Sequence, residues 1–366
     1  MKICLCTNIY YNVGVAETAY QYSLAAKRLG IDFVVSGFIE EKAAKQLPLV
    51  GPMIEWDKLG DVTWDGEEYP LDKKQISGID LFVFYFDNGN FYDQDEVPGS
   101  LERILSIIPR ERTIIVDADG KYNLTMNYAE DSNHISLRAG QNWHHSFDSL
   151  SDAVYQPTFS PIDPKVKSFL FWGYKEPENI GEEKFDVLYL GSNWYRMNQI
   201  KRFLSHFSGI RSLFPKISVW GKNWTKADKY WQQATKPDLT FFEERDIDIR
   251  EYMTEFGEFT QILSGSDFSP ILIRPILSHM GIITPRMLET FASGTIPILT
   301  EDFLYAEQLY GPLSKELFLG SDPEGRLLDM RKNRPYYQKI VNLIRRELRD
   351  EHSYEKRIKD MVRLII

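Results

Sequence analysis

Cysteine is scarce in this chain: Cys4 and Cys6 are the only two in 366 residues. They stand two apart in a strand-like stretch, so their side chains point to the same face, and such neighbours make a poor disulfide. A lone C-x-C is also a weak metal pattern. This excludes a disulfide-stapled secreted domain, and both thiols are predicted to be reduced core residues of a cytosolic protein.

Long apolar runs are missing as well. The chain begins MKICLCTNIYY, a short strand-like run that turns polar at once, which does not resemble a secretory leader. No apolar stretch is long enough to span a bilayer. The expected location is therefore the cytoplasm, with no membrane span.

An excess of positive charge is also missing. Lys and Arg number 43 against 53 Asp and Glu, which gives a net charge of −10. This balance argues against a general polyanion binder and leaves room only for a local basic cleft. With 43% hydrophobic residues, the chain has enough apolar side chains for real cores, and its length suggests about two domains.

Several catalytic and cofactor motifs are absent. There is no H-E-x-x-H, no paired C-x-x-C and no visible nucleophile–base set, so no metal site of these kinds is expected. Neither half carries G-x-G-x-x-G followed by a ribose-binding acid, which makes a nicotinamide oxidoreductase the least favoured enzyme class. Aromatic residues are not interleaved with a basic run, so a stacking platform for RNA is unsupported.

Alternating strand and helix signals fill the first half, which is typical of an α/β domain with a parallel sheet. Strands are expected at 2–7, 33–36, 81–86, 113–116 and 153–156, and a glycine-bearing loop at 12–18 leads into a helix that ends near Leu29. The stretch from Ser160 to Lys184 is rich in proline, glycine and charge. We therefore predict an N-terminal Rossmann-like domain at 1–165 and a linker at 166–184.

A second α/β series follows. Strands are expected at 185–190, 216–220 and 296–299, with helices at about 195–207 and, more weakly, 248–256. These elements predict a C-terminal Rossmann-like domain at 185–335, and helical periodicity continues through 336–366. Two α/β domains usually bind a ligand between them, outside the carboxyl ends of the strands.

Glycines follow three of the predicted strands. Gly14 opens the first helix, Gly191 and Ser192 precede Arg196, and Gly221 ends the strand before Trp224. A glycine at such a junction lets backbone N–H groups approach a phosphate or a base edge closely. Asn193 as N-cap would put Arg196 in the first helical turn. The alternatives are plain turn glycines, a solvated Arg196 and core packing of the tryptophan.

The segment Gly281–Asp302 reads as a turn, a short helix and a buried strand. Thr284 suits the N-cap, Arg286 stands in the first turn, Glu289 follows one turn later, and Gly294 suits the C′ stop. The positive end of a helix with an arginine beside it favours an anion. An ordinary helix–strand unit with a surface Arg–Glu pair explains the same segment.

Acidic residues end two strands of the first half. Asp117 and Asp119 form a D-x-D, and Asp87 follows the preceding strand. A D-x-D can hold a divalent cation, place one carboxylate (more readily Asp119) at the cleft rim, or cap a turn. His144, in a helical-looking stretch, is a candidate acid, base or sugar ligand, with packing as the alternative.

Three ordered blocks resemble the spore-maturation-type (CgeB-like) glycosyltransferases. They are Val187–Ser192 with Tyr195–Arg196, then Ile217–Trp224, and then Thr284–Gly294 ending in Leu299–Glu301, within a stretch from Phe185 to Phe303. The first half resembles the wider GT-B glycosyltransferases in layout only, with one glycine where their N-terminal G-G-x-E loop has two.

The resemblance implies a GT-B fold, in which two Rossmann-like domains with parallel sheets face a central cleft. It implies transfer of a sugar from a nucleotide-diphosphate donor, a UDP-sugar above all, without a metal or other cofactor. The implied donor-binding residues are Gly14, Gly191, Ser192, Arg196, Gly221, Thr284, Arg286 and Glu289. Among these, Glu289 would hold the ribose, Thr284 and Arg286 the diphosphate, Arg196 a phosphate, and Gly221 the base. The C-terminal helix at 336–366 would cross back to the N-terminal domain, as in other GT-B enzymes.

The acceptor would bind the N-terminal domain, where Asp119, Asp117 and His144 are the catalytic candidates. A protein, a glycan, a small molecule and modified DNA all stay open as acceptors, and the net negative charge disfavours the last. Two alternatives stay open: a catalytically degenerate binding or scaffold protein, and a metal-dependent transferase that uses Asp117 and Asp119.

Overall fold

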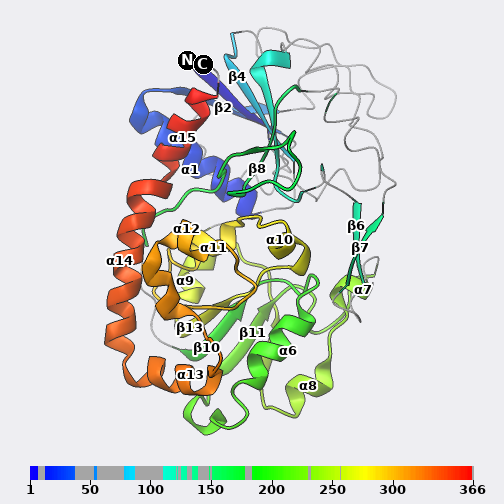
Figure 1. Ribbon diagram of the computed structural model, residues 1–366, viewed down its shortest axis with the longest axis vertical. Coiled ribbons are helices and arrows are strands. Elements are labelled where there is room, and N and C mark those ends of the chain that lie inside the picture. The colour runs from blue at the N-terminus through cyan, green and yellow to red at the C-terminus, as the bar shows by residue number, and fades with distance from the viewer. Residues whose placement is uncertain are drawn as a thin grey trace.

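The computed structural model describes residues 1–6, 13–37, 53–55, 78–86, 110–120, 122, 125–129, 134–138, 148, 151–177, 184–229, 232–255 and 257–364. Two parallel sheets, each with helices against it, lie one above the other in Figure 1. The predicted α/β class is confirmed. The described strands are β1 (Lys2–Cys6), β2 (Asp32–Gly37), β3 (Met53–Glu55), β4 (Leu81–Phe86), β5 (Thr113–Asp117), β6 (Thr125–Ala129), β7 (His134–Arg138), β8 (Val154–Gln156), β9 (Lys167–Ser168), β10 (Phe185–Leu190), β11 (Ile217–Gly221), β12 (Asp248–Glu251), β13 (Ser266–Ile271) and β14 (Ile296–Leu299).

The helices are named in the same order. They are α1 (Val13–Leu29), α6 (Met197–Ser205), α7 (Gln232–Thr235), α8 (Leu239–Glu243), α9 (Glu258–Leu263), α10 (Pro275–His279), α11 (Pro285–Glu289), α12 (Ala306–Tyr310), α13 (Pro323–Lys332), α14 (Arg334–His352) and α15 (Tyr354–Arg363). Among the described residues, none of these helices has the length and apolar character needed to cross a membrane.

The first sheet has the order β3-β2-β1-β4-β5-β8-β9, and the pairs within it are parallel. In β1 every residue after Lys2 is buried, as expected for a strand covered on both faces. Cys4 and Cys6 are free thiols within this core, as predicted. Burial raises the pKa of the Cys4 thiol to about 12, so it stays protonated and unreactive.

Helix α1 covers this sheet through Val15, Ala19 and Tyr22. Gly14 was expected in a loop before the helix, but it lies in the first turn of α1. The hydroxyl of Thr18 donates to the Gly14 carbonyl at 2.8 Å, one turn along the helix. The run of helix-compatible residues after Gly14 extends the helix back over the glycine, because a glycine in the first turn costs little.

The second sheet has the order β12-β11-β10-β13-β14, also parallel. The weak helix expected at 248–256 is wrong, because Asp248–Glu251 forms the edge strand β12. Its side chains are held by β11: Asp248 accepts hydrogen bonds from Ser218 at 3.1 Å and from the Trp220 indole at 3.3 Å. Pairing with a neighbouring strand decided a conformation that local propensity left ambiguous.

A close backbone contact joins the turns after β10 and β11. A Cβ on Gly221 would lie 2.1 Å from the Gly191 carbonyl oxygen, and Gly221 has φ +148°. Trp224, fully buried, donates from its indole to the same carbonyl at 2.6 Å. Gly221 therefore has a packing reason to be glycine, and the prediction that Trp224 belongs to the core is confirmed.

The two sheets are tied together by the connecting segment and the C-terminal helices. β9 lies inside the stretch predicted as linker, yet it pairs with β8 in the first sheet. Further on, Tyr174 pairs with Ser353 at the corner between α14 and α15. Helix α14 then runs beside the lower domain, and α15 packs on α1 of the upper one (Figure 1).

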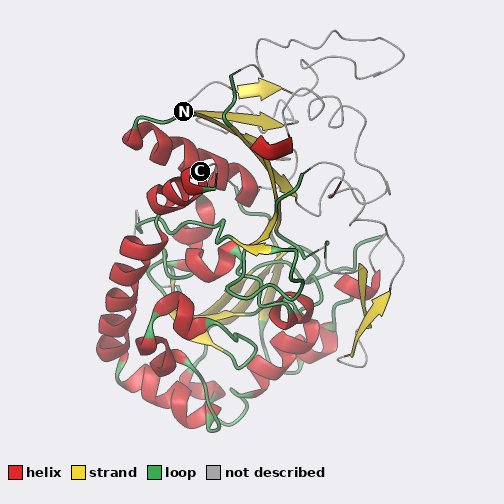
Figure 2. Cartoon of the chain, turned by 45° about the horizontal axis from the view of Figure 1, so that its top comes forward, coloured by secondary structure: helices red, strands yellow, loops and turns green. Residues whose placement is uncertain are grey.

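Aromatic side chains fill the joint beneath α15. The Tyr354 ring stands edge-on to Tyr22 with centroids 5.1 Å apart, and Tyr22 in turn contacts Phe171 at 5.2 Å. Such ring pairs add to the burial energy of each side chain. The chain end is thus part of the core that positions the two sheets. The antiparallel hairpin β6–β7 stands apart from them and lies beside α7 in Figures 1 and 2.

His352 makes stability depend on pH. Burial first, and then the charges of Arg357 and Lys356, lower its pKa from 6.5 to about 3. Because the unfolded chain takes up this proton more readily, stability is full above pH 6.5 and falls as the pH drops toward 3. We expect a loss of about 2 kcal/mol from this residue at pH 5, measured by chemical unfolding at pH 7.5 and 5. His352→Gln should flatten this dependence, and an unchanged slope would contradict the assignment.

Gly221→Ala should destabilise the protein more than Gly257→Ala. Both glycines have positive φ, which costs an alanine about 1–3 kcal/mol, but a Cβ on Gly257 meets no described atom within 4 Å. Only the Gly221 variant adds a clash with the Gly191 carbonyl. Thermal unfolding of the two variants isolates that clash, and equal shifts in Tm would show that the backbone contact does not matter.

Candidate functional site

Three guanidinium groups converge at the carboxyl edge of the second sheet. Arg196 stands at the N-cap of α6 after β10, Arg274 follows β13, and Arg286 belongs to α11. Burial lowers the pKa of Arg196, and the positive charges of Arg274 and Arg286 lower it further. Arg274 and Arg286 therefore each lie close enough to Arg196 to repel it, and a polyanion bound beside Arg196 would relieve that repulsion.

Backbone carbonyls hold Arg196 in place. Its guanidinium donates to the carbonyls of Leu272 and Ser192, each at 3.3 Å, so it spans the turns after β13 and β10. Asn193 is not the N-cap that the sequence suggested. It is buried, and its side-chain amide donates to the carbonyls of Asn223 and Thr235 at 3.1 and 3.0 Å. Because the side-chain amide of Asn193 joins three loops, Asn193 does not cap the helix, and Arg196 stands at the N-cap position instead.

Arg286 offers a donor to a ligand. Its guanidinium stacks on the Phe259 ring, with the central carbon 3.8 Å from the ring centroid. Its Nη1 is buried and has no hydrogen-bond partner among the residues that the structure describes. A buried donor without a partner is costly, so an incoming anion would gain a preformed contact here.

Helix α11 begins as predicted but ends early. Thr284 has an extended backbone at the N-cap position and Pro285 follows as the first helical residue. The helix stops at Glu289, and Gly294, expected as its stop, lies in the turn before β14 and donates from its N–H to the Ser264 hydroxyl at 2.8 Å. The short helix still places Arg286 and Glu289 about one turn apart, on one side.

Asp119 crosses from the first domain to the arginine cluster. Its Oδ1 lies 2.6 Å from Nη2 of Arg274, and the two side chains are 11% and 15% exposed. The other carboxylate oxygen, Oδ2, is buried and lacks a hydrogen-bond partner within the described part of the chain. One oxygen of Asp119 is thus tied to the second domain, and the other is free to accept a proton or hydrogen bond.

Asp117 does not share this position. It is fully buried and its Oδ2 accepts hydrogen bonds from the Tyr122 N–H at 2.8 Å and from Gln156 at 2.9 Å. These bonds brace the loop that carries Asp119. Within the described residues, no group of three His, Cys, Asp or Glu side chains gathers as a metal-ligand set. The proposed D-x-D pair is therefore divided: Asp117 braces the loop, and Asp119 forms the ion pair with the second domain.

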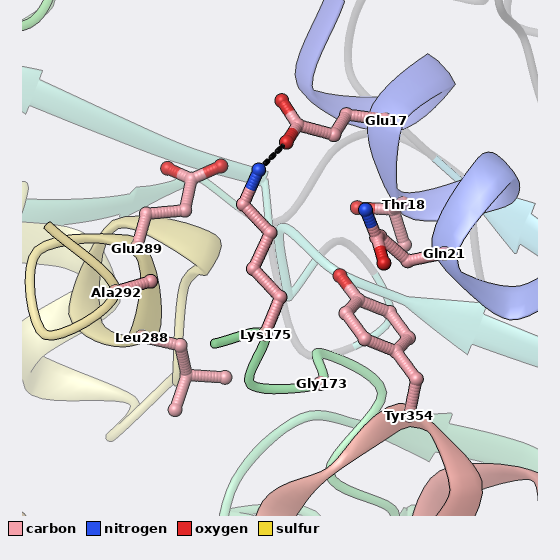
Figure 3. A pocket seen from close by; sticks show the side chains of 9 residues that line it. All are labelled: Glu17, Thr18, Gln21, Gly173, Lys175, Leu288, Glu289, Ala292 and Tyr354. Atoms are coloured by element: carbon pink, nitrogen blue, oxygen red, sulfur yellow. Dashed lines mark hydrogen bonds and ion pairs between the residues drawn. The ribbon is translucent and has the colours of Figure 1, made fainter. Parts of the chain in front are cut away.

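Glu289 lies beside a second ion pair at the domain junction. Lys175, from the connecting segment, pairs with Glu17 of α1, and their side chains are 14% and 12% exposed. Figure 3 shows Lys175 extending between Glu17 and Glu289. Burial raises the pKa of Glu289, the Glu17 charge adds to the rise, and Arg286 and Lys175 oppose it.

A small pocket is built around these charges. Its lining comes from α1, the connecting segment, α11 with the turn after it, and α15, through the residues Glu17, Thr18, Gln21, Gly173, Lys175, Leu288, Glu289, Ala292 and Tyr354. Burial raises the pKa of the Tyr354 phenol well above its usual range, so this hydroxyl stays protonated. The pocket unites both domains with the C-terminal helix.

The structure brings most of the predicted donor residues to one edge. Arg196, Arg286 and Glu289 belong to the cluster, Ser192 contributes a carbonyl to Arg196, and Gly191 and Gly221 shape the turns behind it. Gly14 lies one turn before Glu17 on α1. His144 and Asp87 lie outside the described residues. Sequence reasoning missed Arg274 and Lys175. Arg274 stands between strand β13 and helix α10, but without the glycine that marked the junction before Arg196.

Comparison with known proteins places this geometry in a known fold. No protein-family model matches the chain, and no curated protein matches its sequence. An α-glucosyltransferase solved with UDP-glucose and DNA containing an abasic site is 12% identical with a TM-score of 0.62, and the match covers 100% of this chain and 99% of that one.

Two further structures match 100% of this chain over 99% of their own chains. The α-glucosyltransferase solved with UDP and a 13-mer DNA containing a central A:G mismatch is 13% identical with a TM-score of 0.61. The T4 phage BGT in complex with UDP and Mn²⁺ is 12% identical with a TM-score of 0.55. At such identities the likeness speaks for architecture alone, and by that architecture the chain has the GT-B fold.

Proposed function

We propose that this protein is a glycosyltransferase that takes its sugar from a nucleotide-diphosphate donor. The observation that carries the proposal is the convergence of three guanidinium groups, with Nη1 of Arg286 buried and without a partner among the described residues, one helical turn from Glu289. The blocks that resemble the CgeB-like glycosyltransferases contain Arg196, Arg286 and Glu289, which supports the same assignment.

The donor's diphosphate is assigned to the three arginines. A diphosphate carries enough negative charge to balance their repulsion, and the planar guanidinium fork fits phosphate oxygens. Because these groups are already fixed by packing, they also stabilise the charge that develops on the leaving diphosphate. Cationic side chains can thus supply what a metal ion supplies in other transferases, and we propose a metal-independent reaction.

The ribose is assigned to Glu289. Ribose hydroxyls donate hydrogen bonds to a carboxylate, and such donors favour the ionised form that burial and Glu17 disfavour here. Uridine is the proposed base, since the structures with this fold named above were solved with UDP or UDP-glucose. Gly221 and Gly191, packed backbone to backbone, would form the floor beside the base.

Asp119 is the proposed catalytic base. In the transfer, the acceptor hydroxyl gives its proton to a carboxylate oxygen of Asp119 and its oxygen forms a bond to the anomeric carbon. The bond from that carbon to the diphosphate oxygen breaks, and its electron pair leaves with the nucleoside diphosphate. Oδ2, buried and without a described partner, is the oxygen available for this role.

UDP should raise the Tm of the protein through the arginine cluster. Binding to the folded state alone stabilises it by mass action, by about 2.7 kcal/mol at a ligand concentration of 100 Kd. Arg286→Ala and Glu289→Ala should abolish most of the shift. Arg202→Ala, on the exposed part of the helix that Arg196 begins, is the matched control and should keep it. The absence of any shift with UDP, GDP or their sugars would contradict the proposal.

Binding of inorganic diphosphate should distinguish the proposed phosphate contacts from the proposed ribose contact, because inorganic diphosphate has no ribose. Arg286→Ala is expected to weaken both UDP and inorganic diphosphate, whereas Glu289→Gln should weaken UDP roughly tenfold and leave inorganic diphosphate unchanged, because only the ribose contacts the carboxylate. Calorimetric titration measures both ligands. Equal losses for both ligands in the Glu289 variant would remove the ribose from this residue.

Turnover separates an enzyme from a binding module. A panel of nucleotide sugars should show donor hydrolysis or transfer that persists in chelator, and Asp119→Asn should lower kcat by about a hundredfold or more. Sensitivity to chelator would favour metal-dependent chemistry. Donor binding without turnover on any acceptor class would favour a scaffold.

A further inference from the structure

Arg274 belongs to two charge clusters at once. It is one of three arginines around the proposed diphosphate position, and it holds the proposed base Asp119 across the cleft at 2.6 Å. We propose that Arg274 is a positioning residue that exchanges Asp119 for the donor's diphosphate, so that donor binding releases the base. This inference rests on the proposed function and adds a coupling between its two substrates.

The electrostatics favour such an exchange. Arg274 is repelled by Arg196 and attracted by Asp119, the acidic partner that the described structure gives it. A diphosphate among the arginines supplies a stronger anion on the other side. Two anions then compete for one guanidinium, and each contact that Arg274 makes with phosphate weakens its hold on the carboxylate.

Packing keeps the loop of Asp119 in place while Arg274 changes partner. Gly120, with φ +70°, lies so close to Met280 that a Cβ there would meet the methionine methyl at 2.2 Å. The N–H of Ile283 donates to the Pro157 carbonyl at 2.6 Å, and the Thr158 hydroxyl reaches the Met280 carbonyl at 3.4 Å. These contacts join the two domains without either charge, so the exchange needs a side-chain rotation and no domain opening.

An order of events follows from the exchange. Without donor, Oδ1 of Asp119 is engaged by the Arg274 guanidinium and is not available to the acceptor hydroxyl. With the diphosphate seated, both oxygens of Asp119 face the acceptor and can take its proton. The exchange thus frees the second carboxylate oxygen of Asp119 at the moment when the donor is in place.

The test is the affinity for UDP of variants at the two residues. Breaking the ion pair is part of the cost of binding UDP to the wild-type chain, so Asp119→Asn should bind UDP roughly three- to tenfold more tightly even though it no longer transfers sugar. The expected result is tighter UDP binding after removal of an acidic side chain that contacts no atom of UDP. Unchanged or weaker binding by Asp119→Asn would overturn the proposal.

A double-variant cycle separates exchange from a general field effect. If Asp119 acts by holding Arg274, the gain from Asp119→Asn should vanish in the Arg274→Gln background, where UDP still meets Arg196 and Arg286. If Asp119 acts only as a distant negative charge, UDP binding should tighten by the same factor in both backgrounds, and the proposal fails. Thermal unfolding confirms that each variant is folded, and Asp119→Ser repeats the measurement with a smaller side chain.

The control is a different interdomain ion pair. Glu355 of α15 accepts from Arg28 of α1 at 2.5 Å, away from the arginine cluster. Glu355→Gln loosens the domain contact without touching Arg274 and should leave UDP affinity unchanged. An equal gain in this variant would assign the effect to domain loosening and overturn the exchange. Failure of the wild-type chain to bind UDP at all would instead refute the proposed function.

Discussion

Repulsion of Arg196 by two further guanidinium groups is the constraint around which the carboxyl edge of the second sheet is arranged. Arg196, Arg274 and Arg286 come from three separate junctions of the second sheet, and each is held differently. Arg196 is bound by carbonyls, Arg286 by an aromatic ring, and Arg274 by a carboxylate of the other domain. Holding like charges together costs free energy, which the fold offsets through core packing and the joint beneath α15.

Several site residues of the second domain could be predicted because they stand at a glycine-bearing strand–helix junction or at a capped helix start. Arg196, Arg286 and Glu289 were found from local signals and lie at one edge. What escaped prediction depends on contacts between distant segments. β12 is a strand because it pairs with β11, and Asn193 is a loop tie because two carbonyls from later loops reach it. No window of sequence contains both partners of such contacts.

The two aspartates show the same limit on a smaller scale. Sequence spacing presents Asp117 and Asp119 as equivalent, and a D-x-D reading depends on that equivalence. The structure separates them: Asp117 is satisfied inside its own domain by Tyr122 and Gln156, and Asp119 reaches across to Arg274. Whether Asp117 or Asp119 contacts the other domain depends on the residues of that domain. It can therefore be determined only from a structure that contains both sheets.

The different contacts of Asp117 and Asp119 help to explain why the site spans two domains. Asp119 lies opposite Arg274, so under the proposed exchange a carboxylate of one domain and a diphosphate bound to the other would compete for the same guanidinium. The neutral contacts at Met280 and Ile283 hold the domains in register meanwhile. Under the proposed exchange, donor binding would be converted into a local electrostatic change, with no large movement of the chain.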